Sequence, residues 1–175
     1  MNSSAVSFNV TMINKNSNKK ETNRMKATVL FNKGKYRGTS DNQILYCDGT
    51  AVWHWNKDVN ECTVNKLDGS ASDDLMNPAA LLSNYSKNFR AKFIRQENDG
   101  TVVIDLSPKK ARSYHKVRLL INGETGVLKK LELHNYDGSC GEYVVSNFKS
   151  GVACKDSDFI FPQSQNPKVE VIDMR

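Results

Sequence analysis

Short segments in which apolar and polar residues alternate recur along almost the whole chain. Residues 7–12 read Ser-Phe-Asn-Val-Thr-Met, and residues 25–31 place an apolar side chain at every second position. A period of two puts the apolar side chains on one face of a half-buried strand. Turn-forming pairs such as Asp48-Gly49 and Asn122-Gly123 separate the segments. The pattern predicts a mainly β protein built as an antiparallel meander of ten to twelve strands.

The other expected strands show the same alternation. After the Lys33-Gly34 turn into Tyr36, they cover residues 43–47, 51–55, 61–66, 90–96, 101–107, 116–121, 128–135, 142–148 and 159–161, with a last short one at 169–171.

One segment, after residue 76, breaks this period. Asn77 can cap a helix, and Pro78 suits its first position, where the missing N–H has no partner to lose. The apolar residues that follow are spaced as one stripe of an α-helix: Leu81, Leu82, Tyr85 and Phe89. We expect a short helix whose stripe lies against the sheet.

The two faces of the central hairpins follow from the register. A two-residue turn at Asp48-Gly49 pairs Ile44 with Trp53, and a four-residue loop at 56–59 pairs Trp53 with Cys62. One face then carries Ile44, Tyr46, Trp53, Trp55, Cys62 and Val64. The opposite face carries Leu45, Cys47, Val52, His54, Glu61 and Thr63. The aromatic-rich face is either an ordinary core or the lining of a binding cavity.

The amino-acid composition limits the class of protein to which the chain can belong. The 175 residues fit one domain, and only 38% are hydrophobic, which is little for a well-filled core. Apolar runs do not exceed four residues, so the sequence predicts no membrane-spanning helix. The net charge of +6 comes from basic residues scattered along the chain. They indicate a solvated basic rim, attracted to acidic partners or anionic lipid headgroups, rather than a nucleic-acid site.

Chemistry-bearing motifs are missing from the sequence. His54, His115 and His134 have no metal-ligand spacing, and neither a nucleophile elbow nor a phosphate-binding glycine loop occurs. We therefore expect no enzyme, no catalytic residue, no metal and no cofactor. The cysteines (Cys47, Cys62, Cys140 and Cys154) form no Cys-x-x-Cys pair, and both packed thiols and one or two disulfides stay open.

Residues 44–56 resemble the periplasmic outer-membrane lipoprotein carrier family (LolA-like), and most closely its Bacteroidetes-type members. The shared features are an apolar strand, a Cys-Asp-Gly turn and a Trp-His-Trp strand that ends in Asn56. The Asn-Pro-Ala-Ala-Leu-Leu segment at 77–82 and the endings Phe-Ile-Phe at 159–161 and Val-Glu-Val-Ile-Asp at 169–173 also resemble the family. The resemblance covers nearly the whole chain in order.

The resemblance implies a single domain over 1–175, an unclosed antiparallel β-barrel of about eleven strands with a short helical lid. Its function would be to shelter lipoprotein acyl chains in an apolar cavity and hand them to the outer membrane. The implied partners are an inner-membrane release complex and an outer-membrane acceptor, met by a monomer in the periplasm after removal of its signal peptide. The implied cavity residues are Val29, Phe31, Ile44, Tyr46, Trp53, Trp55 and Val64, and the implied lid residues are Leu81, Leu82, Tyr85 and Phe89.

Two features depart from the family pattern. The family's first lid helix precedes the strand matched by residues 8–13, where this chain has only seven residues. An Arg-Pro that holds the lid closed is replaced by Phe-Asn-Lys-Gly-Lys at 31–35. The alternative function is a non-enzymatic interaction or sensor domain on the same fold, without lipoprotein transport.

Overall fold

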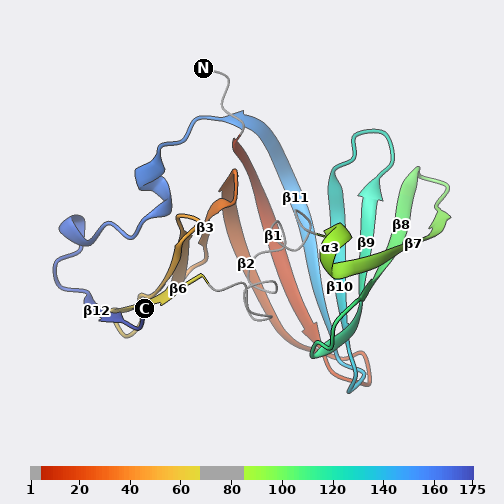
Figure 1. Ribbon diagram of the computed structural model, residues 1–175, viewed down its shortest axis with the longest axis horizontal. Coiled ribbons are helices and arrows are strands. Elements are labelled where there is room, and N and C mark those ends of the chain that lie inside the picture. Colours follow the sequence, from red (N-terminus) through yellow and green to blue (C-terminus); the bar gives the residue numbers. More distant parts are fainter. Residues whose placement is uncertain (1–4, 68–84) are drawn as a thin grey trace. The chain divides into compact units, whose positions relative to one another are not determined.

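The computed structural model describes residues 5–67 and 85–175, and most of these residues lie in β-strands (Figure 1). The strands are β1 (Ala5–Lys15), β2 (Glu21–Asn32), β3 (Lys35–Thr39), β4 (Gln43–Cys47), β5 (Ala51–Asn56), β6 (Glu61–Lys66), β7 (Phe89–Gln96), β8 (Thr101–Pro108), β9 (Tyr114–Asn122), β10 (Leu128–Asn135), β11 (Cys140–Val152) and β12 (Glu170–Asp173). The helices are α3 (Tyr85–Asn88) and the 3-10 turns η1 (Asp156–Phe159) and η2 (Gln163–Gln165).

The strands form one unclosed sheet of twelve, in the order β12-β6-β5-β4-β3-β2-β1-β11-β10-β9-β8-β7. The expectation of a mainly β, unclosed sheet is confirmed. The strands from β2 to β6 and from β7 to β11 pair antiparallel with their neighbours in sequence. Two pairs of neighbouring strands depart from the meander. β1 lies beside β11, and β12 pairs parallel to β6, with Val171 opposite Cys62.

The chain divides into two compact units. Unit 1 comprises residues 1–9, 27–80 and 147–175, and unit 2 comprises residues 10–26 and 81–146. Strands β1, β2 and β11 contribute residues to both units. Strands β3 to β6 and β12 belong to unit 1, and β7 to β10 belong to unit 2.

Local turn chemistry explains the hairpins of unit 1. Between β2 and β3, Lys33 and Gly34 both have positive φ (49° and 86°), as the expected two-residue turn requires. Between β4 and β5, the Asp48 N–H donates to the Ala51 carbonyl, and the Asp48 carboxylate accepts from the Thr50 and Ala51 amides. The central turn residues are therefore Gly49 and Thr50, one position later than expected.

That later turn shifts the pairing by two residues. Trp55, rather than Trp53, lies opposite Ile44, and Cys62 lies opposite Trp55. The predicted pairs were wrong, but a shift by an even number leaves every side chain on its expected face.

The expected strand at 159–161 is wrong. The Asp158 N–H donates to the Lys155 carbonyl, and the Asp158 carboxylate accepts from the Lys155 amide, which closes the turn of η1. Phe159 and Phe161 are both buried, so their spacing of two reflects two separate contacts with the protein interior rather than a strand.

The expected helix is only partly described. Residues 77–82, with Leu81 and Leu82, lie outside the described residues, and α3 ends at Asn88. Phe89 is the first residue of β7, paired with Pro108, and so it is not part of a helical stripe as predicted. Within residues 5–67 and 85–175, no helix has the length and apolar character needed to cross a membrane.

Candidate functional site

The aromatic face of unit 1 is assembled as the sequence predicts. The register places six side chains on it: Ile44, Tyr46, Trp53, Trp55, Cys62 and Val64. Tyr46, Cys62 and Val64 are buried, and the other three are half-buried. Burial raises the pKa of Tyr46 and raises the pKa of the Cys62 thiol to about 11, because an apolar surrounding disfavours the charged form.

The C-terminal segment of the described chain covers this face. The Phe161 ring meets Tyr46 at a centroid distance of 6.1 Å and Trp55 at 5.4 Å, edge to face in both cases. Val169 and Val171 pack into the same cluster. A second cluster joins Phe159 to Ala5 and Leu30.

Polar contacts hold the segment in place on unit 1. Lys35 forms an ion pair with Asp156 at 2.7 Å, and the Asn60 side-chain amide donates to the Lys168 carbonyl at 2.8 Å. Part of the aromatic face is therefore packed against the chain's own C-terminal segment. Ile44, Trp53 and Trp55 stay half-buried there.

Val29 and Phe31 lie on the opposite face. Val29 pairs with Gly38, which pairs with Leu45, and Phe31 pairs with Tyr36, which pairs with Cys47. The seven predicted cavity residues therefore do not share one face of the sheet. Each of these two chains of paired residues continues across β4 into β5 on the same face. We call this face the second face, and its residues are Val29, Phe31, Tyr36, Gly38, Leu45, Cys47, Val52 and His54.

The second face combines apolar side chains with free space. Tyr36 and Cys47 are buried, and Val29, Phe31, Leu45 and Val52 are half-buried. A Cβ atom on Gly38, in the middle of the face, would have no atom of the described residues within 4 Å. His54 adds a polar edge, since its Nε2 lies 3.2 Å from the Gln43 side-chain oxygen.

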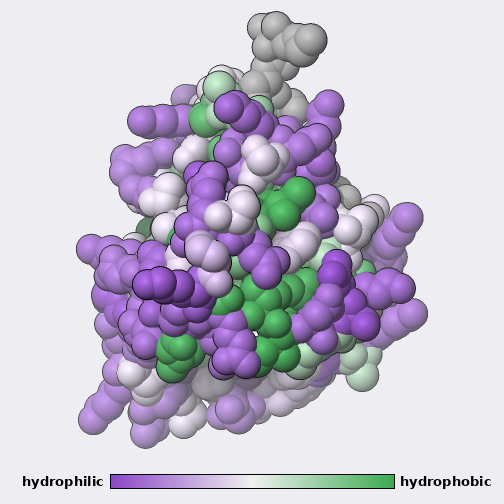
Figure 2. Space-filling view, turned by 90° about the vertical axis from the view of Figure 1, so that its left-hand side faces the viewer, coloured by the Kyte–Doolittle hydropathy of each residue, from purple (hydrophilic) through white to green (hydrophobic). Residues whose placement is uncertain are grey.

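Among the described residues of unit 1, the exposed large apolar side chains are Val59, Phe148, Ile160, Ile172 and Met174. Ile172 lies on the edge strand β12, and Met174 directly follows it. Figure 2 views the side that carries β12, and hydrophobic residues form a patch there among hydrophilic ones. Ile172 pairs with Thr63, which pairs with His54, so it continues the second face at the edge of the sheet.

Of the four expected lid residues, Leu81 and Leu82 lie outside the described residues. Phe89 is buried in unit 2, where its ring stacks on Tyr114 at 6.4 Å. Tyr85 begins α3. Sequence analysis missed Phe161 and Val169 as parts of the aromatic cluster, and Gly38 as an opening. The sequence pointed to Phe161 only through the Phe-x-Phe spacing, and to Gly38 only as a glycine within a short strand.

The described residues contain neither a disulfide nor a metal-ligand cluster. The four cysteines are thiols, with Cys47, Cys62 and Cys140 buried and Cys154 half-buried. Among the side chains that the structure describes, no group of three or more His, Cys, Asp or Glu residues is placed to hold a metal ion.

Comparison with known proteins identifies the family. Residues 35–162 match the model of the family described as "Outer membrane lipoprotein carrier protein LolA". An outer-membrane lipoprotein carrier protein of Cupriavidus necator is 33% identical over 129 residues, which cover 70% of this chain and 59% of that protein. A homologous carrier of Nitrosomonas europaea is 27% identical over 135 residues, covering 73% of this chain and 63% of the other. The chain thus spans about three-fifths of the curated relatives it matches.

A structural comparison agrees on the fold. An uncharacterized conserved protein from Thermus thermophilus superimposes with a TM-score of 0.63 at 11% identity, covering 98% of this chain and 91% of the other. Because the family match spans most of the chain, and the unclosed sheet is the fold it implies, this protein belongs to the LolA family of outer-membrane lipoprotein carriers.

Proposed function

We propose that the protein is a non-enzymatic periplasmic carrier that shelters lipoprotein acyl chains on the second face of unit 1. It receives them from an inner-membrane release complex and delivers them to an outer-membrane acceptor. Family membership supports the lipoprotein role. The observation that carries the site is the set of half-buried apolar side chains around Gly38, where a Cβ atom would meet no described atom within 4 Å. The chain's own Phe161 covers part of the aromatic face instead.

The free energy expected for acyl-chain binding is compatible with a carrier that must also release its cargo. Burying a methylene group contributes about 0.8 kcal/mol, so a long acyl chain on a fully apolar cavity gains on the order of 10 kcal/mol. A cover that buries itself on the empty face must be displaced by the lipid, which lowers the net affinity. The sequence predicts such a cover at Leu81, Leu82 and Tyr85, of which Leu81 and Leu82 lie outside the described residues. Affinity is then a difference between two burials, which permits release at the outer membrane.

Filling the space at Gly38 tests this assignment. Gly38→Leu puts an isobutyl group where the acyl chain would lie, and its φ is compatible with a side chain. The matched control is Arg37→Leu, one residue away on the same strand but on the aromatic face. Binding of a fluorescent fatty acid and of a triacylated lipopeptide to delipidated protein is measured for both variants.

We expect Gly38→Leu to weaken binding roughly tenfold or more, the equivalent of about two methylene contacts, while Arg37→Leu binds like the wild type. Thermal unfolding of both variants checks that each one is folded. Equal binding by both folded variants contradicts the assignment to the second face. Absence of lipid binding by the wild type itself would favour the interaction or sensor domain instead.

A further inference from the structure

Charge is divided unequally between the two units. Unit 2 contains 16 Lys and Arg residues against 8 Asp and Glu residues, a net charge of 16 − 8 = +8. Unit 1 contains 9 basic and 11 acidic residues, a net charge of 9 − 11 = −2. Basic residues that are scattered in sequence are therefore gathered by the fold into one unit.

The carboxylates on the polar face of unit 2 are neutralised within the sheet. Arg118 binds Asp105 through two bonds of 2.7 and 2.9 Å. Lys130 lies 2.8 Å from Glu132 and 3.0 Å from Glu142. The three acidic side chains are only 13–18% exposed. They therefore contribute little negative potential outside the protein.

The exposed charge of this face lies on the edge strand β7. Arg90 pairs with Ser107, and Lys92 pairs with Asp105, so both project on the polar face at the end of the sheet. Both are exposed, and neither forms an ion pair within the part of the chain that the structure describes. The exposed Lys87 and Lys110 flank the strand, since the Lys109 amide donates to the Asn88 carbonyl and joins the two connecting segments.

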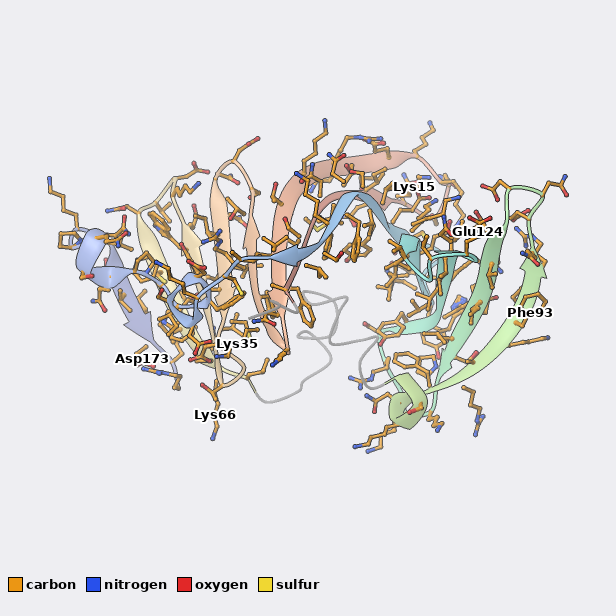
Figure 3. The ribbon with its side chains drawn as sticks, turned by 90° about the horizontal axis from the view of Figure 1, so that it is seen from above. Lys15, Lys35, Lys66, Phe93, Glu124 and Asp173 are labelled. Atoms are coloured by element: carbon orange, nitrogen blue, oxygen red, sulfur yellow. The ribbon has the colours of Figure 1, made fainter. Side chains whose placement is uncertain are left out.

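An exposed aromatic ring lies on the same strand. Phe93 is 62% exposed, and it pairs with Ile104 at the outer end of the apolar face. Figure 3 marks it on β7 at the outer border of unit 2. We call Lys87, Arg90, Lys92, Phe93 and Lys110 the β7 edge. The cations and the ring project from opposite faces of the same edge strand, so an approaching surface meets both along the edge. Cations together with an exposed aromatic ring are typical of surfaces that bind the interface of an anionic bilayer.

Pairing with a further strand is disfavoured at this edge. A register shift interrupts β7 between Phe93 and Arg95, and charged side chains protect edge strands from strand addition. A lipid surface needs no strand register, so this irregularity does not oppose it.

We propose that the β7 edge is a peripheral docking surface for anionic phospholipid bilayers. The cations are attracted to the headgroup phosphates, and the Phe93 ring inserts at the level of the headgroups. This inference is independent of the acyl-chain site, because it uses residues of unit 2 alone. It supplies a reversible membrane contact that does not require a protein acceptor.

Vesicle binding tests the proposal directly. The intact protein is sedimented with vesicles of phosphatidylcholine alone or with roughly one-third phosphatidylglycerol. We expect binding to the anionic vesicles only, and its loss when NaCl rises from about 0.05 M to about 0.5 M, because salt screens exposed charges. Neutralising Arg90→Gln and Lys92→Gln together should weaken binding roughly 30-fold, since each cation near an anionic surface contributes about 1 kcal/mol.

The control variant, Lys57→Gln with Lys168→Gln, removes the same charge from exposed positions of unit 1. It should bind vesicles like the wild type, and Phe93→Ser should weaken binding without changing its salt dependence. Equal loss in the control and the β7 variants would overturn the proposal, because only net charge would then matter. Equal binding to neutral and anionic vesicles, or binding only to an acidic polypeptide, would also overturn it.

Discussion

The Phe161 ring meets Trp55 edge to face, with ring centroids 5.4 Å apart and planes inclined at 70°. Phe161 is 5% exposed, so Phe161→Ala removes a nearly complete set of contacts. We expect it to lower the free energy of unfolding by about 3–5 kcal/mol, measured by urea denaturation. Phe148→Ala, at a ring that is 43% exposed, is the control and should cost roughly 1 kcal/mol or less. Similar losses at the two positions would contradict a packed aromatic face.

Asp105 gives a pH dependence with a defined sign. The bond from Arg118 lowers the pKa of Asp105 below its usual value, so its contribution to stability is complete above the unfolded pKa of about 4. That contribution disappears as the pH falls through the lower folded value. Asp105→Asn should therefore lower the free energy of unfolding at pH 7 and reduce the loss that acidification causes.

The comparison for Asp105 is Asp156→Asn, which breaks an ion pair whose carboxylate is 83% exposed. It should change the free energy of unfolding by roughly 0.5 kcal/mol or less across the same pH range. The assignment of the acid sensitivity fails if Asp105→Asn and the wild type lose stability in parallel between about pH 5 and pH 2.

Two glycines of unit 1 should respond oppositely to the same substitution. Gly34 has φ of 86°, where a side chain is strained, so Gly34→Ala should destabilise the protein by about 1 kcal/mol. Gly38 lies in a strand with open space around it, and Gly38→Ala should be neutral or stabilising by roughly 0.5 kcal/mol. Thermal unfolding of both variants decides the point, and a larger loss at Gly38 would mean that its surroundings are filled.

Thiol reactivity should rank the cysteines by burial. Cys154 is half-buried, with its Sγ 3.3 Å from the Asn32 amide nitrogen, whereas burial raises the pKa of Cys62 to about 11. Since the thiolate is the reactive form, we expect iodoacetamide at about pH 8 to label Cys154 at least roughly tenfold faster than Cys62. Peptide mass spectrometry measures both rates, and unfolding in urea should abolish the difference. Equal rates in the folded protein would show that the aromatic cluster opens readily.

The sequence was sufficient for most of the strands and for the two faces of the hairpins from β4 to β6. Alternation depends on the backbone period alone, so the two-residue error at Asp48-Gly49 left Trp53 and Trp55 on the correct side. Which face of the sheet is covered could not be predicted, because Phe161 reaches the aromatic face from a distant part of the chain. The resemblance led to one cavity set that included Val29 and Phe31, which the register of β2 places on the second face.

The distribution of charge over the molecule could not be predicted from the sequence either. The basic residues are spread along the sequence, and only the fold shows that unit 2 holds the excess and that Asp105, Glu132 and Glu142 are neutralised inside it. Phe93 looks like an ordinary inward-facing strand residue in the sequence. Its exposure follows from the position of β7 at the end of the sheet, which no local pattern encodes.

The late position of Phe161 affects biogenesis. It follows Val64 by 97 residues, so a growing chain displays the tryptophans of β5 long before their covering ring has been made. Contacts between such distant residues form slowly, which prolongs this exposed stage. During synthesis, the apolar side chains of β5 therefore stay uncovered until Phe161 has been made.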